Sequence, residues 1–397
     1  MKKLLSKFLS VAAAYSLPLI FGIIIALIWA NISPGSYHAF VDFPLFGSEF
    51  TVHFLVKDVF MAIFFAIAMT EITEAVRPGG AMYPIKKALN PLMATIGGVV
   101  GPVVIYVLMI ILFDCPEYID GWGIVTATDI AIAWLGTKLI FGPSHPAVKY
   151  LLLLAVADDA IGLLIIGIFY PTAPIEYSFL LLCAFGMLIA FVLRAMHVQH
   201  YGYYLILGGI PCWLGLYLAN IEPALGLVFV VPFIPSVHRR EQMIIDGVVP
   251  KDPDHLALEN FYWHWKPVAD YGLFFFGLVS AGVMFSSIGI VTLIVAVSLI
   301  LGKALGIFLF GFVGSKIGFH LPEGMTKTDL ILVAIVAGVG LTVSLFICDA
   351  AFTDATVVGA AKMGALFSIA AVLSGYGVSK LVKKRPLKSL EEKETEL

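Results

Sequence analysis

Residues 148–170, VKYLLLLAVADDAIGLLIIGIFY, decide the fold, because an apolar run of this length carries two adjacent aspartates at its centre. A helix of about 20 apolar residues crosses the hydrocarbon core of a bilayer. The run is continuously apolar and does not alternate with period two, which excludes a strand of a membrane β-barrel. It therefore predicts a transmembrane helix with charge at mid-depth.

The rest of the chain has the same character. Its 397 residues are 60% hydrophobic and 13% charged, whereas roughly 25% of residues are charged in soluble domains. Hydropathy predicts about twelve transmembrane helices joined by short connections. The apolar windows are 11–30, 55–76, 92–113, 121–140, 148–170, 179–193, 203–219, 223–235, 267–285, 288–313, 330–348 and 357–380. We predict an all-α polytopic membrane protein that is not an enzyme, contacts membrane lipid and binds no nucleic acid.

The basic residues predict how the chain is oriented. When the windows are traced from a cytoplasmic amino terminus, every lysine and arginine except Lys57, Lys303 and Lys362 falls on the cytoplasmic side. Positive charge stays on that side in short loops. We therefore expect both termini in the cytoplasm, a single transmembrane domain at 1–380 and a charged cytoplasmic tail at 381–397.

Two smaller features concern the outer side and the cysteines. Residues 43–52, FPLFGSEFTV, read as strand, Gly-Ser turn and strand, so we expect a short outer β-hairpin, with an irregular loop as the alternative. A lone hairpin is marginally stable, so this one is expected to pack on something, such as a second copy of itself. The cysteines lack metal-site spacing, and no disulfide is predicted; they are Cys115, Cys183, Cys212 and Cys348.

The three exceptional lysines differ in depth. Lys57 lies near the outer end of its window and is expected to snorkel to the interface. Lys303 lies near the middle of window 288–313, where an ammonium requires a partner or a water-filled cavity. Lys362 lies within the last window, where it could serve as a structural pair or a helix-terminus counterion.

Three aspartates lie at the same depth as Lys303. Asp129 is near the centre of the fourth window, and Asp158 and Asp159 are central in the fifth. A buried ion-pair network that only fixes helix packing is the alternative, but burying charge is a poor route to stability. Neighbouring helical residues point about 100° apart, so one of Asp158 and Asp159 is expected to face a cavity and the other a neighbouring helix.

Two stretches predict breaks in helices. Thr126-Ala127-Thr128-Asp129 combines poor helix formers, and Gly338-Val339-Gly340-Leu341-Thr342 has two glycines. Close helix packing is the alternative for the glycines. The fourth and eleventh helices run in opposite directions, so they could be matching interrupted helices of an inverted-topology repeat, crossing at the midplane. Unwound backbone at the breaks would supply carbonyl oxygens for a cation, with Lys303 and Asp129 offsetting the half-helix dipoles.

The chain resembles NhaA-type sodium/proton antiporters over nearly its whole length, in both the content and the order of several motifs. The stretches that carry the resemblance are Thr128 to Ala131, the Asp158-Asp159 pair, Gly302 to Gly306, Leu321 to Phe346, Ala26 to Asn31 and Met61 to Phe65.

The resemblance implies a function and a set of roles. Asp159 would be a principal cation ligand beside Thr128 and Asp129, and Asp158 would pair with Lys303. The outer hairpin would help to form a homodimer in the bacterial inner membrane. The protein would use no cofactor and would exchange one Na⁺ or Li⁺ for two protons electrogenically, expelling sodium in sodium and pH homeostasis. The second proton would be carried by Asp158 or by Lys303.

Three positions depart from the family pattern. Glu71-Ile72-Thr73-Glu74-Ala75 replaces Glu-x-Lys-Arg-Glu, Asn220-Ile221-Glu222-Pro223-Ala224 replaces Gly-Val-His-Ala-Thr, and Asp349 replaces a small uncharged residue. Because Glu71, Glu74 and Glu222 lie near regions that respond to pH in the family, we expect the transport chemistry to carry over more closely than the pH profile.

A second class of protein fits the residues as well. A sodium-coupled symporter of an organic solute could use a similar inverted-repeat scaffold. It would take up solute in a Na⁺-dependent way, and Na⁺ alone would not dissipate a pH gradient.

Overall fold

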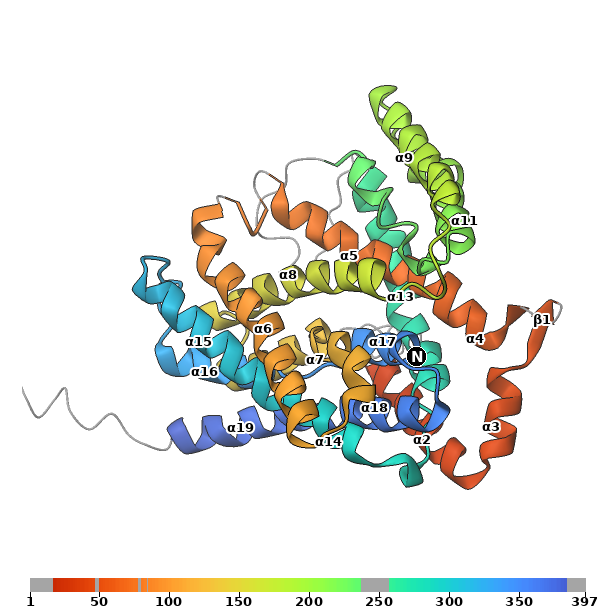
Figure 1. The fold of residues 1–397 in the computed structure, drawn as a ribbon. Coiled ribbons are helices and arrows are strands. Elements are labelled where there is room, and N and C mark those ends of the chain that lie inside the picture. Colours follow the sequence, from red (N-terminus) through yellow and green to blue (C-terminus); the bar gives the residue numbers. More distant parts are fainter. Residues whose placement is uncertain (1–16, 47–49, 78–79, 84, 237–256, 384–397) are drawn as a thin grey trace, which may run out of the picture.

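The computed structural model describes residues 17–46, 50–77, 80–83, 85–236 and 257–383, and most of them are helical (Figure 1). The helices are α2 (Leu17–Ile32), α3 (Pro34–Val41), α4 (Val52–Phe54), α5 (Met61–Val76), α6 (Ile85–Leu112), α7 (Ile130–Phe141), α8 (Pro146–Phe169), α9 (Leu180–Ala195), α10 (Tyr201–Tyr203), α11 (Ile210–Leu218), α13 (Ala257–Ser280), α14 (Ile290–Val297), α15 (Lys303–Lys316), α16 (Lys327–Val336), α17 (Thr342–Ala351), α18 (Ala355–Phe367) and α19 (Ala370–Lys383).

Shorter helical segments complete the chain. Three π-helical segments lie within longer helices: η1 (Leu55–Phe60), η4 (Tyr204–Gly209) and η8 (Ser298–Gly302). The 3₁₀ segments are η2 (Pro116–Val125), η3 (Tyr177–Phe179), η5 (Pro223–Leu225), η6 (Val231–Phe233) and η7 (Phe285–Ser287). Isolated π-helical turns of this kind occur often near functional sites, and η8 leads directly into Lys303.

Among the described residues, six helices are long and apolar enough to cross a membrane, or seven if η2 and α7, bent by 60°, count as one span. The protein is thus a multi-pass membrane protein. Window 11–30 begins outside the described residues. The α-helix expected at window 223–235 does not form: the 3₁₀ segments η5 and η6, joined by turns, take its place, and Pro232 inside the window has no N–H for an α-helical bond.

The helices pack as two groups. We call the first the α6 bundle; it contains η2, α6, α7, α8 and α14 to α19. The second, the α13 bundle, contains α2, α5, α9, α11 and α13 with η1, η4, η5 and η6. The two bundles meet where α5 packs on α8 and α13 on α17. Figure 1 shows α9 and α11 side by side at one edge of the molecule and α15 with α16 at another.

A small antiparallel sheet precedes α4. Strand β1 (Pro44–Phe46) pairs with β2 (Phe50–Thr51), which fits the two expected strands; the turn between them, 47–49, lies outside the described residues. We call this end of the molecule the sheet side. All four cysteines are free and buried. The predicted tail lies outside the described residues from 384 onward, and α19 continues to Lys383.

Candidate cation site

Two interrupted segments cross in the α6 bundle. The first break, 126–129, separates η2 from α7, and the second, 337–341, separates α16 from α17. The backbone N–H of Asp129 donates to the carbonyl of Val339 at 2.8 Å. The hydroxyl of Thr128 donates to the carbonyl of Ala337 at 3.2 Å. These two bonds join the breaks directly and supply partners to backbone that no helix satisfies.

The carboxylate of Asp129 lies at the start of two half-helices. Its Oδ1 accepts from the backbone N–H of Ile132 at 3.1 Å in α7. Its Oδ2 accepts from the hydroxyl of Thr342 at 3.2 Å and from the N–H of Thr342 at 3.4 Å in α17. Helix N-termini carry partial positive charge. One buried carboxylate therefore offsets two helix dipoles.

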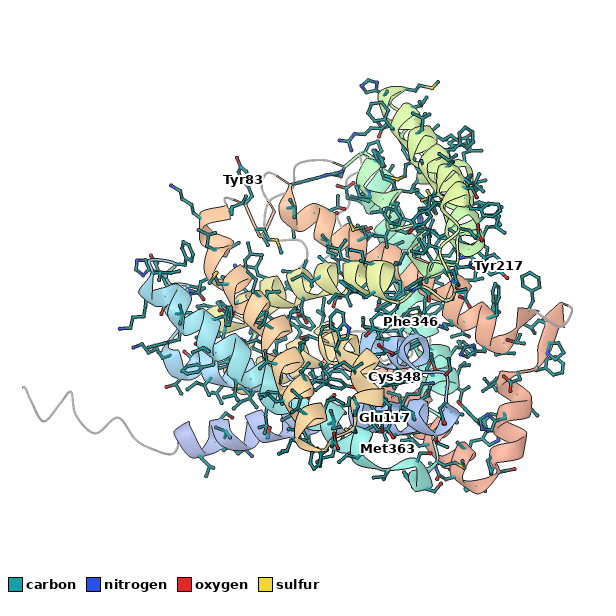
Figure 2. All side chains as sticks on the ribbon, in the orientation of Figure 1. Tyr83, Glu117, Tyr217, Phe346, Cys348 and Met363 are labelled. Atoms are coloured by element: carbon teal, nitrogen blue, oxygen red, sulfur yellow. The ribbon has the colours of Figure 1, made fainter. Side chains whose placement is uncertain are left out.

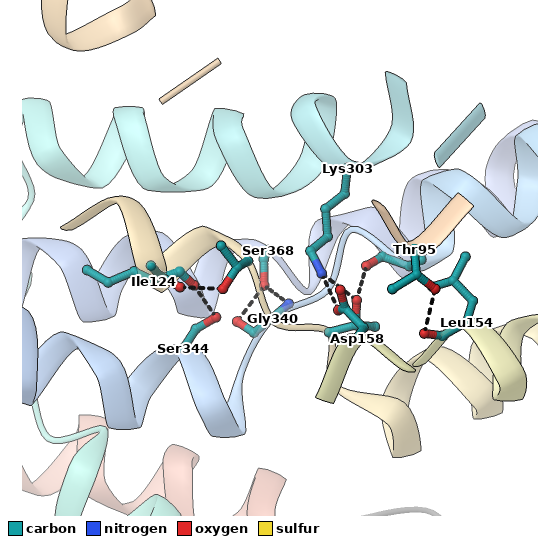
Figure 3. Close-up of polar contacts among 12 residues, drawn as sticks. Thr95, Ile124, Leu154, Asp158, Lys303, Gly340, Ser344 and Ser368 are labelled. Atoms are coloured by element: carbon teal, nitrogen blue, oxygen red, sulfur yellow. Dashed lines mark hydrogen bonds and ion pairs between the residues drawn. The ribbon is translucent and has the colours of Figure 1, made fainter. Parts of the chain in front are cut away.

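Lys303 holds the opposite charge. Its Nζ donates to Asp158 Oδ2 at 2.6 Å and to Thr128 Oγ1 at 2.6 Å, and Figure 3 shows it reaching the aspartate from the neighbouring helix. The side chains of Lys303 and Asp158 are fully buried. Since Thr128 also bonds the carbonyl of Ala337, where α16 ends, the ammonium lies near the negative end of that half-helix.

Asp158 and Asp159 occupy different environments. Asp158 Oδ2 is bound by Lys303, whereas Asp159 is 9% exposed and makes no ion pair among the described residues. The Oδ1 atoms of both residues are buried and lack a hydrogen-bond partner in the part of the chain that the structure describes. A buried carboxylate oxygen without a partner is costly. It is the group that a dehydrated cation or a proton would satisfy.

Two serines support the crossing, and sequence reasoning missed both. Ser368 Oγ accepts from the N–H of Gly340 at 2.9 Å and approaches its carbonyl at 3.1 Å, and Ser344 Oγ donates to the carbonyl of Ile124 at 2.7 Å (Figure 3). The sequence signals are a hydroxyl within an apolar window and, for Ser344, its place in the stretch from Leu321 to Phe346 that carries the resemblance. Gly340 itself is needed for close approach, because a Cβ there would lie 2.9 Å from the carbonyl oxygen of Ala127.

The remaining predicted positions make contacts of their own. Glu71, on α5, accepts from the hydroxyl of Tyr262 at 3.1 Å, and Glu74 lies one turn further along α5. Lys362 pairs with Asp349 at 2.7 Å, which is the structural pair considered from the sequence.

Lys57 differs from its expected snorkelling position. Its Nζ lies 4.0 Å from Glu222 Oε2, and its side chain is only 14% exposed. The reason is that Glu222 is buried and attracts the ammonium inward.

Comparisons with known proteins agree on the kind of protein. The model of the family described as Na⁺/H⁺ antiporter 1 matches residues 6–378. The chain is 48% identical to the Na(+)/H(+) antiporter NhaA 2 of Pelobacter propionicus over 96% of this chain and 99% of the relative. It is 49% identical to the Na(+)/H(+) antiporter NhaA of Geotalea uraniireducens over 94% of this chain and 96% of the relative.

A solved structure shares the fold. The sodium proton antiporter MjNhaP1 from Methanocaldococcus jannaschii superposes with a TM-score of 0.54 over 98% of this chain and 100% of that chain. The two sequences are 14% identical, so the likeness concerns the fold alone.

Proposed function

The chain belongs to the Na⁺/H⁺ antiporter 1 family, and from that premise we propose that Asp159 is the group at which Na⁺ and H⁺ compete. The function of the protein is Na⁺/H⁺ exchange, so the protein is a transporter and not an enzyme, and the family uses no cofactor. The observation that carries the proposal is the buried Oδ1 of Asp159, which has no hydrogen-bond partner among the described residues, next to an aspartate that Lys303 already neutralises.

Competition follows from the chemistry of a single carboxylate. Asp159 binds either a proton or a dehydrated Na⁺, and a hard cation takes oxygen ligands. Asp129 and Thr128 supply further oxygens at the crossing. Binding of one ion excludes the other, so downhill movement of protons in one direction drives Na⁺ in the opposite direction.

The second proton of an electrogenic cycle has two candidate carriers. Asp158 and Lys303 form one buried pair, and such a pair titrates as a unit. A proton gained by Asp158, or lost by Lys303, removes the attraction that holds the pair. Either change would couple exchange of one Na⁺ or Li⁺ for two protons to a rearrangement at the crossing.

The broken helices support an architecture of about twelve spans with an inverted repeat, in a single transmembrane domain at 1–380. Alternating access would come from movement of the α6 bundle relative to the α13 bundle around the fixed site. Both termini would be cytoplasmic, in a bacterial inner membrane. The β1–β2 sheet would contribute to a homodimer, and Glu71, Glu74 and Glu222 would tune the response to pH.

The relatives do not support the sodium-coupled symporter considered from the sequence, since they are Na⁺/H⁺ antiporters. The same assay separates the two classes. A symporter would leave a pH gradient intact when Na⁺ is added without solute.

Everted membrane vesicles with a dye that reports ΔpH test the assignment of Asp159. Wild-type protein dissipates ΔpH on addition of Na⁺ or Li⁺, and Asp159→Asn does not, because an amide neither releases a proton nor carries charge. Asp354→Asn is the matched control, since Asp354 is an exposed N-cap of α18 and asparagine also caps. Normal exchange by Asp159→Asn would refute the assignment.

A further inference from the structure

A buried charge pair on the sheet side takes no part in the cation site. Lys57 on η1 and Glu222 at the start of η5 both belong to the α13 bundle, and their charged atoms are 4.0 Å apart. The Glu222 side chain is 1% exposed, and within the described part of the chain its other oxygen accepts one long bond of 3.5 Å, from the N–H of Ala224. A buried carboxylate is costly without a nearby cation. Glu222 therefore holds the ammonium of Lys57 in place.

From that position Lys57 reaches the other bundle. Its Nζ lies 5.3 Å from the centre of the Phe346 ring on α17, which is within the range of attraction between a cation and an aromatic face. Residues four apart lie on one face of a helix, so Phe346 is one turn beyond Thr342, the residue that bonds Asp129. The contact thus lies one helical turn from the cation site.

An aromatic pair lies beside this contact. The rings of Phe346 and Phe65 meet edge to face with centroids 5.2 Å apart, and both side chains are buried. Phe65 belongs to α5 in the α13 bundle, in the half of that helix nearer the sheet, so this contact also crosses between the bundles. Figure 2 labels Phe346 in the interior of the molecule. The two rings thus form a second contact between the bundles beside that of Lys57.

The neighbouring ion pair serves as a contrast. Asp349 on α17 and Lys362 on α18 are 2.7 Å apart, and both helices belong to the α6 bundle. This pair joins the carboxyl-terminal end of α17 to α18. It lies less than one turn from Phe346 along α17, so two charged contacts flank the same end of this helix.

We propose that Lys57, held by Glu222, is the latch of a gate on the sheet side: its ammonium on the Phe346 ring, with Phe65 beside it, keeps the bundles together while the cation site faces the opposite side. This gate rests on the proposed function, because it acts only if the bundles alternate. When they separate on the sheet side, Lys57 stays with Glu222 and loses only the ring. A contact between a cation and a ring is weak enough to break in every cycle.

Kinetics of Na⁺ exchange in everted vesicles test the latch. In everted vesicles Na⁺ is added to the side opposite the sheet side. Lys57→Gln and Phe346→Leu weaken the contact that keeps the sheet side closed, so fewer molecules have the cation site open to the added Na⁺. Each raises the apparent KM for Na⁺ by roughly two- to fivefold, with less effect on the maximal rate. The double variant shows no greater rise than the larger single effect. Lys57→Arg keeps a charge that stacks on rings and stays near wild type.

Two further variants make the result specific. Lys327→Gln removes a contact of the same kind inside one bundle, where its Nζ lies 5.1 Å from the centre of the Phe312 ring, and leaves the KM unchanged. If Lys57→Gln fails to reach the membrane because Glu222 is left unpaired, Lys57→Gln with Glu222→Gln replaces it and shows the same rise in KM.

An unchanged KM in the latch variants, or single effects that multiply in the double variant, would overturn the gate. Loss of exchange by Asp159→Asn would then leave the proposed cation site intact. Normal exchange by Asp159→Asn would refute the site itself, whatever the latch variants show.

Discussion

Two neighbouring aspartates differ because of helix geometry. Adjacent side chains on α8 point about 100° apart, so Asp158 meets Lys303 from the adjoining helix while Asp159 does not. Burial penalises a charge that has no partner much more than one that has. The same sequence motif therefore provides one aspartate that is neutralised by the protein and one that requires an ion.

The ion pair between Lys303 and Asp158 makes a stability prediction. Lys303→Met leaves a buried carboxylate without its cation and is expected to lower the free energy of unfolding by about 3–5 kcal/mol. Lys303→Met with Asp158→Asn removes both charges and recovers most of that loss. Thermal unfolding of the purified proteins in detergent measures the difference. Equal destabilisation in the single and double variants would show that the lost stability does not come from the ion pair with Asp158.

The charged residues of the cation site could be predicted from the sequence. Asp129, Asp158, Asp159 and Lys303 stand out because few other charges lie at mid-depth, and the structure places them around one crossing. Lys57 was misplaced because its partner, Glu222, is distant in sequence. Hydropathy measures the depth of a side chain and carries no information about which residue it meets.

Broken helices are the elements that define the site, and Gly340 limits how closely they cross. A Cβ at Gly340 would lie 2.7 Å from Ser344 Oγ and 2.9 Å from the carbonyl oxygen of Ala127. We expect Gly340→Ala to push the breaks apart and to abolish exchange in vesicles. Gly377→Ala, where a Cβ meets nothing within 4 Å, is the control and should retain exchange. Wild-type exchange by Gly340→Ala would contradict the close crossing.

The start of α18 makes a prediction about pH. Hydrogen bonds from the hydroxyl and N–H of Thr356 and the N–H of Val357 lower the pKa of Asp354, which lies outside the membrane spans. A pKa that is lower in the folded state gives stability above the unfolded value, and this stability is lost as pH falls through the folded value. Asp354→Asn should remove this contribution to the pH dependence of Tm. Identical Tm profiles at acidic pH would show that the cap does not contribute.

Elements were predicted unevenly from the sequence. The breaks at Thr126–Asp129 and Gly338–Leu341 could be located because hydroxyl side chains and glycines weaken helices locally. Window 223–235 is apolar enough to predict an α-helix, but the structure has 3₁₀ segments and turns there, and Pro232 removes an α-helical bond. Apolarity predicts that a segment lies in the membrane. Whether that segment forms an α-helix depends on its proline, glycine and hydroxyl residues.

At the scale of the whole molecule, the packing of two bundles could not be predicted. Windows of similar hydropathy give no indication of which helices pair, and the contact of α5 with α8 and of α13 with α17 depends on side-chain shape. The relatives are Na⁺/H⁺ antiporters that match nearly the full chain, so both bundles belong to the exchanger. The proposed gate lies at the interface between these bundles.

Release of protons on binding of Na⁺ tests the central claim most directly. Purified protein in a weakly buffered detergent solution is mixed with NaCl, and the pH is followed, with choline chloride as the control for ionic strength. Competition at Asp159 predicts that wild-type protein releases protons as Na⁺ binds and that Asp159→Asn releases fewer or none. Equal proton release by wild-type protein and Asp159→Asn would contradict the account.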